Sequence, residues 1–253
     1  MGLGFRFVES AARAGSGTDH RTCRLTTVAL APLDLAALLC SRVCHDVIGP
    51  VGAIINGLEV LDGEEDDEMR SIAMDLIKKS AASASTRLQF CRLAFGAAGS
   101  LTAAIDTGDA ENAARALIAN DRTSLRWNAS RQLAPKNMVK LMLNMCLIAA
   151  GCVPRGGAVT VEFEGEADRT IRVEANGPNA KLPHSAAAIL TQAAADMVDA
   201  HSIQSYYAAL LARECGMTIE ALSSLEAVIL KAAPAGVNLD GAPASAAAKP
   251  AVV

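Results

Sequence analysis

Two long helical patterns separated by an acidic turn constrain this chain more than any other feature of its sequence. The first pattern begins at Leu33, and the second ends near Ala98. The turn between them, residues 62–67, reads Asp-Gly-Glu-Glu-Asp-Asp. Glycine is common where a helix ends, and the first turn of a helix favours negative charge. The sequence therefore predicts two antiparallel helices, a hairpin that occupies residues 31–100.

The remainder of the chain divides where its composition and periodicity change. Residues 1–30 are mixed in character and predict a flexible arm, 101–123 predict a helical linker, and 233–253 are rich in Ala and Pro and predict a disordered tail. Residues 124–232 combine strand and helix periods. Strands are expected at 125–128, 159–163, 170–174, 217–222 and 226–230, and helices at 135–150, 184–198 and 202–214. The predicted fold class is α+β, with an N-terminal helical hairpin followed by a C-terminal α/β sandwich.

Charge and composition exclude several classes of function. The net charge of -4 gives no reason to expect a nucleic-acid or anionic membrane partner. No uninterrupted apolar run reaches the roughly 18 residues that span a bilayer, and the first 28 residues carry no convincing secretion signal. The seven cysteines are odd in number and mostly lie in apolar helical patterns, which favours a reduced, cytoplasmic protein. Cys40 and Cys44 flank His45, but no Cys-x-x-Cys pair or second histidine lies nearby, so no metal site is expected.

His45 lies on the polar side of the first predicted helix. At about 100° per residue, it points away from an apolar stripe that should face a core. Small or polar residues share the side of the histidine: Asp34, Ser41, Gly49, Gly52 and Asn56, with Leu38 as the exception. The stripe itself consists of Ala36, Leu39, Cys40, Val43, Val47, Val51, Ile54, Leu58 and Leu61.

The residues that follow His45 are costly in a helix. Each interior glycine gives up about 1 kcal/mol and a proline about 3 kcal/mol, so Gly49, Pro50 and Gly52 are poor choices for stability alone. Reflecting the hairpin about its turn places His45 level with Ala81–Ser85, another run of small side chains. An exposed helical histidine is often an ordinary solvated residue. Here the low surface around it favours a reactive histidine that another domain can approach closely.

The segment from His45 to Ile54 resembles the phospho-accepting box of sensor histidine kinases. In that family a histidine is followed by an acid, with proline five places on, as in His45, Asp46 and Pro50. The resemblance implies that His45 accepts phosphate and that Asp46 orients its ring. Gly49 stands where the family has Thr or Asn, a position tied to phosphatase activity, which argues against a strong phosphatase.

The second half of the chain resembles the ATP-binding domain of the same kinases, with its motifs altered. Residues 144–149 resemble the Asn-containing box, but Ile148 stands where the magnesium-binding asparagine belongs. Residues 176–180 resemble the first glycine box, with Ala175 in place of the adenine-binding aspartate and Asn179 in place of a glycine. The region of the second glycine box, 203–208, contains no glycine. Glycine-rich turns cradle phosphates, so these losses argue against ATP binding.

A kinase-like hairpin joined to such an altered domain is similar to the ChpT family of bacterial histidine phosphotransferases. The resemblance implies a homodimer whose hairpins form a four-helix bundle, acting in a cell-cycle phosphorelay. It implies a CckA-type hybrid kinase receiver as donor and CtrA- and CpdR-type response regulators as acceptors. No cofactor of its own is implied, because the receiver supplies Mg²⁺. An active ATP-dependent kinase and a non-catalytic dimeric scaffold remain as alternatives.

Receiver contacts are expected around the histidine and on the second domain. Arg42 lies one turn before His45 and could touch the partner or the phosphate, or it could be simply solvated. Arg169 and Arg172, in or beside a strand, are candidate contacts for an acidic regulator. The residues expected to dock the receiver are Arg42, Gly49, Gly52, Asn56 and Ser83.

Overall fold

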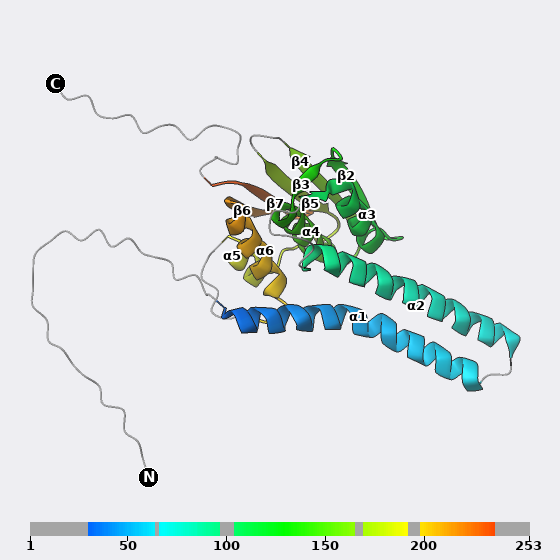
Figure 1. Ribbon diagram of the computed structural model, residues 1–253. Coiled ribbons are helices and arrows are strands. Elements are labelled where there is room, and N and C mark those ends of the chain that lie inside the picture. The colour runs from blue at the N-terminus through cyan, green and yellow to red at the C-terminus, as the bar shows by residue number, and fades with distance from the viewer. Residues whose placement is uncertain (1–29, 64–65, 97–103, 165–168, 192–197, 236–253) are drawn as a thin grey trace, which may run out of the picture.

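The computed structural model describes residues 30–63, 66–96, 104–164, 169–191 and 198–235 (Figure 1). The predicted arm up to residue 29 and the predicted tail from residue 236 lie outside the described residues. The described part consists of a long helical hairpin that projects from a domain built on a β-sheet. This arrangement confirms the predicted α+β fold class.

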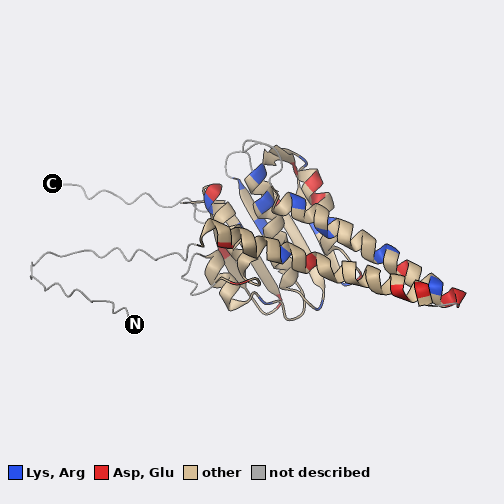
Figure 2. Ribbon diagram, turned by 60° about the horizontal axis from the view of Figure 1, so that its bottom comes forward, with Lys and Arg blue, Asp and Glu red and all other residues tan. Residues whose placement is uncertain are grey.

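The hairpin is formed by α1 (Pro32–Gly63) and α2 (Asp67–Ala94). Asp66 caps α2, because its side chain accepts a hydrogen bond from the backbone N–H of Glu68 at 2.9 Å. Arg70 in the first turn of α2 donates to the carbonyl of Leu61 at 2.6 Å and closes the tip. The acidic tip lies at the end of the hairpin farthest from the sheet (Figure 2). The turn predicted from the sequence is therefore confirmed.

The C-terminal domain is a five-stranded sheet in the order β2-β4-β5-β7-β6. Strands β2 and β4 pair in parallel, and every other neighbouring pair in this sheet is antiparallel. The strands are β2 (Thr123–Ala129), β4 (Gly157–Glu164), β5 (Thr170–Asn176), β6 (Met217–Ser223) and β7 (Ala227–Pro234). The helices are α3 (Thr107–Ile118), α4 (Lys136–Gly151), α5 (His184–Leu190) and α6 (Ile203–Glu214). Residues 192–197, which belong to the helix predicted over 184–198, lie outside the described residues.

A second, two-stranded sheet departs from the sequence-based expectation. β1 (Ala104–Asp106) pairs antiparallel with β3 (Leu133–Pro135), whereas a helix was predicted from residue 102. The helix α3 begins only after Asp106, whose side chain accepts from the N–H of Gly108 at 2.8 Å. A three-residue strand is too short to show a period of two, and its partner lies far along the chain, so the local pattern hid it.

The core of the domain lies between the sheet and helix α4. Alternate residues of β5 are buried, among them Ile171 and Val173, and 12 of the 16 residues of α4 are buried. A smaller cluster (Ile189, Val198, Ile203 and Tyr206) packs against Leu35, Leu38 and Leu39 of α1. The first turns of the hairpin therefore rest on α5 and α6, and this contact fixes the position of the hairpin relative to the domain.

Helix α1 is long and apolar enough to cross a membrane by length and composition alone. Polar residues interrupt its apolar sequence, so no membrane-spanning segment was predicted here. In the structure, α1 packs along α2 over its length and against α6 near its start. An apolar helix of this kind is also what helix-on-helix packing requires.

Candidate functional site

His45 stands on the open side of α1, and its side chain is 77% exposed. Its Nδ1 lies 3.5 Å from Oδ1 of Asp46, which is an ion-pair distance rather than a good hydrogen bond. The carboxylate therefore stands beside one ring nitrogen and leaves Nε2 directed away from it. A proton held on Nδ1 would leave the lone pair of Nε2 free as a nucleophile.

Asp46 is held in place by Arg42. The Nε of Arg42 donates to Oδ2 of Asp46 at 3.2 Å, across one turn of α1. The Asp46 side chain is only 17% exposed and that of Arg42 26%. Arg42 was expected on the docking surface, but the structure directs it toward Asp46 and the C-terminal domain. Its guanidinium therefore positions the carboxylate that faces the histidine.

The C-terminal domain reaches the histidine through the loop before α6. Ala200 and His201 line a recess of about 60 Å³ together with Ser41, Arg42 and His45. Sequence reasoning missed both loop residues, because they are more than 150 positions away from His45. The sequence does carry a signal for an ordered turn before α6, because Asp199 and Ser202 have the spacing of a reciprocal capping pair.

The loop before α6 is held by that pair. Oδ1 of Asp199 accepts from the N–H of Ser202 at 2.8 Å and from its hydroxyl at 2.7 Å. Ser202 Oγ in turn accepts from the N–H of Asp199 at 2.9 Å. The hydrogen bonds from Ser202 hold the pKa of the Asp199 carboxyl below its usual range. The loop therefore presents His201 to the recess in a defined conformation.

The pairing of α1 with α2 is shifted by about one helical turn from the prediction, which reflected the hairpin about its acidic turn. Asp46 lines the same cavity as Arg87 and Cys91, and Gly57 contacts Ala73 and Ile77. His45 is therefore level with the segment near Arg87–Cys91, rather than with Ala81–Ser85. Ser83, expected to dock the receiver, is half-buried.

The glycines near His45 border open space. A Cβ added at Gly49 or Gly52 would meet no atom within 4 Å, and Asn56 is exposed. Gly57 differs, because an added Cβ would lie 2.7 Å from Cγ1 of Ile77. Gly49 and Gly52 leave the surface beside His45 free of protruding side chains, whereas Gly57 allows the two helices to approach closely. This distinction was not visible in the sequence.

The apolar stripe of α1 is covered on one side only. Five of its members are half-buried: Leu39, Val43, Val47, Ile54 and Leu61. The other four, Ala36, Cys40, Val51 and Leu58, are exposed, and Ile48 and Ile55 extend the apolar surface beside them. Near the base of the hairpin an open apolar groove of about 520 Å³ runs along this side, lined by Ala36, Cys40, Cys44 and Leu88 among others. One partner helix cannot cover so wide a stripe.

Arg172 belongs to a row of charges across the outer face of the sheet. It bonds Glu162 on β4 at 3.1 Å and also bonds Glu174. Burial works against the charged form, but these carboxylates hold the pKa of Arg172 above its usual value. Arg169 is partly exposed just before β5. Of the two arginines expected to meet a regulator, Arg172 already has carboxylate partners within the sheet.

Two of the three segments that resemble nucleotide-binding boxes, 144–149 and 203–208, are largely buried. The Nδ2 of Asn144 donates to the carbonyl of Ala94 at 3.2 Å and to that of Lys140 at 2.8 Å, so it joins α4 to the end of α2. Ile148 is 9% exposed and Ala175 is fully buried. Asn179 has a φ of 59°, the left-handed conformation that favours glycine and tolerates asparagine. The glycine-free region 203–208 forms the first turns of α6.

Cysteines lie on both faces of the hairpin and in the core. Cys40 and Cys44 are exposed free thiols, and Cys91 is buried below Asp46. Burial raises the pKa of the Cys146 thiol to about 12 and that of Cys152 to about 11. Within the described ranges, no three His, Cys, Asp or Glu side chains are grouped as a metal site would require.

Comparison with known proteins places this architecture among phosphotransferases. Residues 107–226 match the family model of the histidine phosphotransferase C-terminal domain. The protein phosphotransferase ChpT of Brucella abortus (strain 2308) is 48% identical over 207 residues, which cover 81% of this chain and 98% of that protein. A solved bacterial phosphotransferase superposes with a TM-score of 0.74 at 47% identity, covering 81% of this chain and 98% of that one. The histidine kinase AdeS of Acinetobacter baumannii is more distant, with a TM-score of 0.41 and 7% identity.

Proposed function

The chain belongs to the ChpT family of histidine phosphotransferases, and on that premise we propose that His45 accepts a phosphoryl group from one receiver domain and passes it to another. The observation that carries this assignment is the geometry at His45. The ring is exposed, Asp46 stands at Nδ1, and Arg42 holds Asp46 in place.

Both transfer steps use the same nitrogen. The lone pair of Nε2 attacks the phosphorus of an aspartyl phosphate, and the bond between phosphorus and the aspartyl oxygen breaks to release a carboxylate. The proton on Nδ1 stays there, beside the carboxylate of Asp46, while the ring carries the phosphoryl group. A carboxylate of a second receiver then attacks the phosphorus and regenerates the free imidazole. In-line attack needs the two reacting atoms about 3 to 3.5 Å apart, which the low surface at Gly49 and Gly52 permits.

The resemblance to the family supplies the finer parts of the proposal. The donor is the receiver of a CckA-type hybrid kinase, and the acceptors are CtrA- and CpdR-type regulators in a cell-cycle phosphorelay. Mg²⁺ comes with the receiver, and this chain contributes no cofactor and does not use ATP. The burial of Ile148 and Ala175 supports that last point, as does the use of Asn144 to bind the end of α2. The protein acts in the cytoplasm.

The protein is further proposed to act as a homodimer. The exposed half of the α1 stripe, with Val51, Leu58 and the neighbouring Ile48 and Ile55, would be covered by a second hairpin. Two such hairpins give a four-helix bundle, whose packing places apolar stripes of all four helices in one core. His45 lies on the opposite side of α1, so the bundle leaves it open.

Transfer from a labelled phosphorylated receiver tests the proposal directly. His45→Gln should accept no label, while the free energy of unfolding changes by less than about 0.5 kcal/mol, because the side chain is exposed. His184→Gln is the matched control, since His184 is an exposed histidine on α5, and it should accept label as the wild type does. Label retained by His45→Gln would refute the assignment. Label acquired from ATP and Mg²⁺ alone would restore the kinase alternative.

A further inference from the structure

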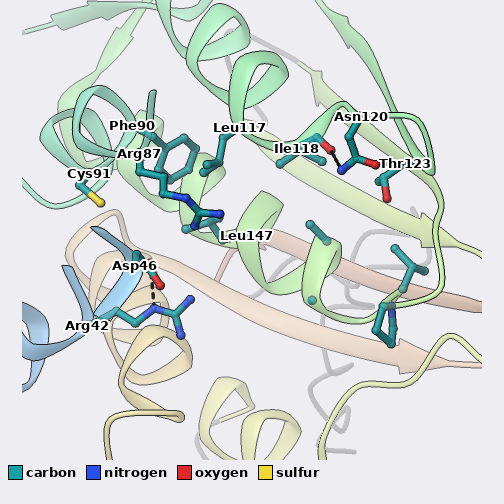
Figure 3. A pocket seen from close by; sticks show the side chains of 14 residues that line it. Arg42, Asp46, Arg87, Phe90, Cys91, Leu117, Ile118, Asn120, Thr123 and Leu147 are labelled. Atoms are coloured by element: carbon teal, nitrogen blue, oxygen red, sulfur yellow. Dashed lines mark hydrogen bonds and ion pairs between the residues drawn. The ribbon is translucent and has the colours of Figure 1, made fainter. Parts of the chain in front are cut away.

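A cavity of about 430 Å³ lies where the hairpin meets the C-terminal domain, and Arg42 and Asp46 of α1 line it (Figure 3). Its walls come from α1, α2, the end of α3 and the C-terminal end of α4. A volume of this size lies within the range of roughly 300–1,000 Å³ that small-molecule sites occupy. Arg42 and Asp46 belong both to this cavity and to the site at His45, whereas the other lining residues have no part in the proposed phosphoryl transfer.

Two arginines face the cavity, and one of them lacks a partner. Figure 3 shows Arg42 reaching in from α1 and Arg87 from α2. Among the described residues that line the cavity, Asp46 is the single acid, and its Oδ2 is taken by Arg42. The Nε of Arg87 is buried and has no hydrogen-bond partner in the described part of the chain. A buried donor without an acceptor is costly, and more so on a charged group.

The missing partner should be an anion. Guanidinium groups match the oxygens of phosphate, often through two parallel hydrogen bonds. Arg42 offers the remaining nitrogens of its guanidinium to the same cavity as Arg87, so a phosphate between them would bridge the two side chains. The negative charge of Asp46 would oppose a ligand, but Arg42 already offsets it.

The walls around the arginines combine apolar and polar side chains. Phe90, Leu117 and Leu147 lie near Arg87 (Figure 3), and Val153 and Pro154 also line the cavity. Asn120 and Thr123 are polar residues of the lining. Inorganic phosphate would leave this apolar surface in contact with water, whereas an organic phosphate would cover it. Burying apolar ligand surface there contributes about 25 cal/mol per Å².

We propose that this cavity is a binding site for a small phosphomonoester with an apolar body, whose phosphate pairs with Arg87 and Arg42. When bound, the phosphate competes with Asp46 for Arg42 and so loosens the carboxylate beside Nδ1 of His45. The ligand then slows phosphoryl transfer. This last consequence rests on the proposed function of His45, whereas binding itself does not.

Binding is measured by calorimetry on the full-length, unphosphorylated protein, with phenyl phosphate and inorganic phosphate as probes. Phenyl phosphate should bind at least about tenfold more tightly than inorganic phosphate, because its ring covers the apolar wall. Arg87→Gln should weaken phenyl phosphate binding by about tenfold or more. Arg126→Gln, an exposed arginine on β2 that does not line the cavity, is the control and should bind as the wild type does.

A second variant tests the cavity without changing its charges. Ala150 lies on the wall contributed by α4, and Ala150→Leu should fill part of the space and also weaken binding. Arg87→Gln removes a buried donor that has no partner, so it should fold at least as stably as the wild type. No preference for phenyl phosphate over inorganic phosphate would overturn the ligand class. Equal binding by the wild type and Arg87→Gln would overturn the site.

Transfer kinetics separate this site from the receiver interface. Saturating phenyl phosphate should slow transfer to the wild type, leave Arg87→Gln unaffected, and leave the rate of that variant without ligand unchanged. Slower transfer to Arg87→Gln without any ligand would show that the arginine meets the partner protein, and would overturn the proposal. A protein that binds phenyl phosphate but carries no label on His45 would refute the proposed function and leave the binding site standing.

Discussion

Helices α1 and α4 are both rich in apolar residues, but they differ in how many of those residues the chain buries. Of the 32 residues of α1 only Gly57 is buried, whereas α4 buries 12 of its 16. α4 finds all its packing partners within its own chain, between the sheet and the helices α2, α3 and α6. α1 has α2 along one side, and the other side of its apolar stripe is uncovered. The domain is therefore complete in one chain, and the hairpin is proposed to be completed by a second.

The largest effect should come from a cavity in the core of the domain. Leu141→Ala, at a fully buried position of α4, should lower the free energy of unfolding by about 2–5 kcal/mol. Leu33→Ala, at a position 84% exposed in the first turn of α1, should change it by less than about 0.5 kcal/mol. Fluorescence of Trp127, the single tryptophan, reports unfolding of the domain through β2. Equal decreases in the free energy of unfolding of the two variants would show that the two helices do not differ in this way.

The open side of α1 should matter for chemistry and not for folding. Gly52→Leu should slow transfer from a phosphorylated receiver by about a hundredfold, because a displacement of about 1 Å at the reacting atoms has that effect. Gly63→Leu is the matched control at the hairpin tip, where an added Cβ also meets nothing. Ser83→Leu should slow transfer less than Gly52→Leu, because the helix register places His45 nearer Arg87 than Ser83. Wild-type rates in Gly52→Leu would show that receivers dock elsewhere.

The uncovered half of the stripe should hold the dimer together. Leu58→Glu places a charge on that apolar surface, and sedimentation should show dissociation at concentrations where the wild type is dimeric. The expected cost is about 2 kcal/mol or more per interface, typical of a central contact. Lys79→Glu reverses a charge at an exposed position of α2, a larger change of charge than Leu58→Glu makes, and should leave the assembly unchanged. A monomeric wild type would show that the stripe has another partner.

The smallest effect separates two glycines on the same helix. Gly49→Ala should raise the free energy of unfolding by up to about 1 kcal/mol, because alanine favours helix and its methyl group meets open space. Gly57→Ala should lower it by about 1 kcal/mol, since the clash with Ile77 outweighs the gain in propensity. Circular dichroism during thermal unfolding measures both. Stabilisation of both variants would mean that the helices can separate freely near Gly57.

The sequence predicted the elements whose evidence is local. The hairpin, its acidic turn and the regular strands and helices of the domain show in the period of apolar residues. β1 and β3 were not predicted, because the period of apolar residues cannot be recognised in a strand of three residues. The helix register was missed by a turn, because reflection about the turn ignores the close contact at Gly57 that sets it.

The candidate site divides in the same way. His45 and Asp46 are adjacent in sequence, and the pattern around them placed the histidine on the open face. The role of Arg42 was not predicted, because one turn of helix allows it to face either the solvent or Asp46. His201 was not predicted either, since contacts across more than 150 residues depend on the whole fold. The pairing of Arg172 with Glu162 required the strand register.

The hydrogen bonds of Asn144 have a consequence for the thermodynamics of partner binding. One carboxamide joins the last turn of α2 to α4, while Leu35 and Leu38 tie the start of α1 to α6. Attached at both of its helices, the hairpin has little freedom to swing relative to the sheet. A receiver that touches both parts therefore meets a surface already in its bound shape. The entropy that a hinged protein loses when a partner closes it has here been lost during folding. Association should accordingly show a small entropic penalty and a weak dependence on the length of the segment between α2 and β1.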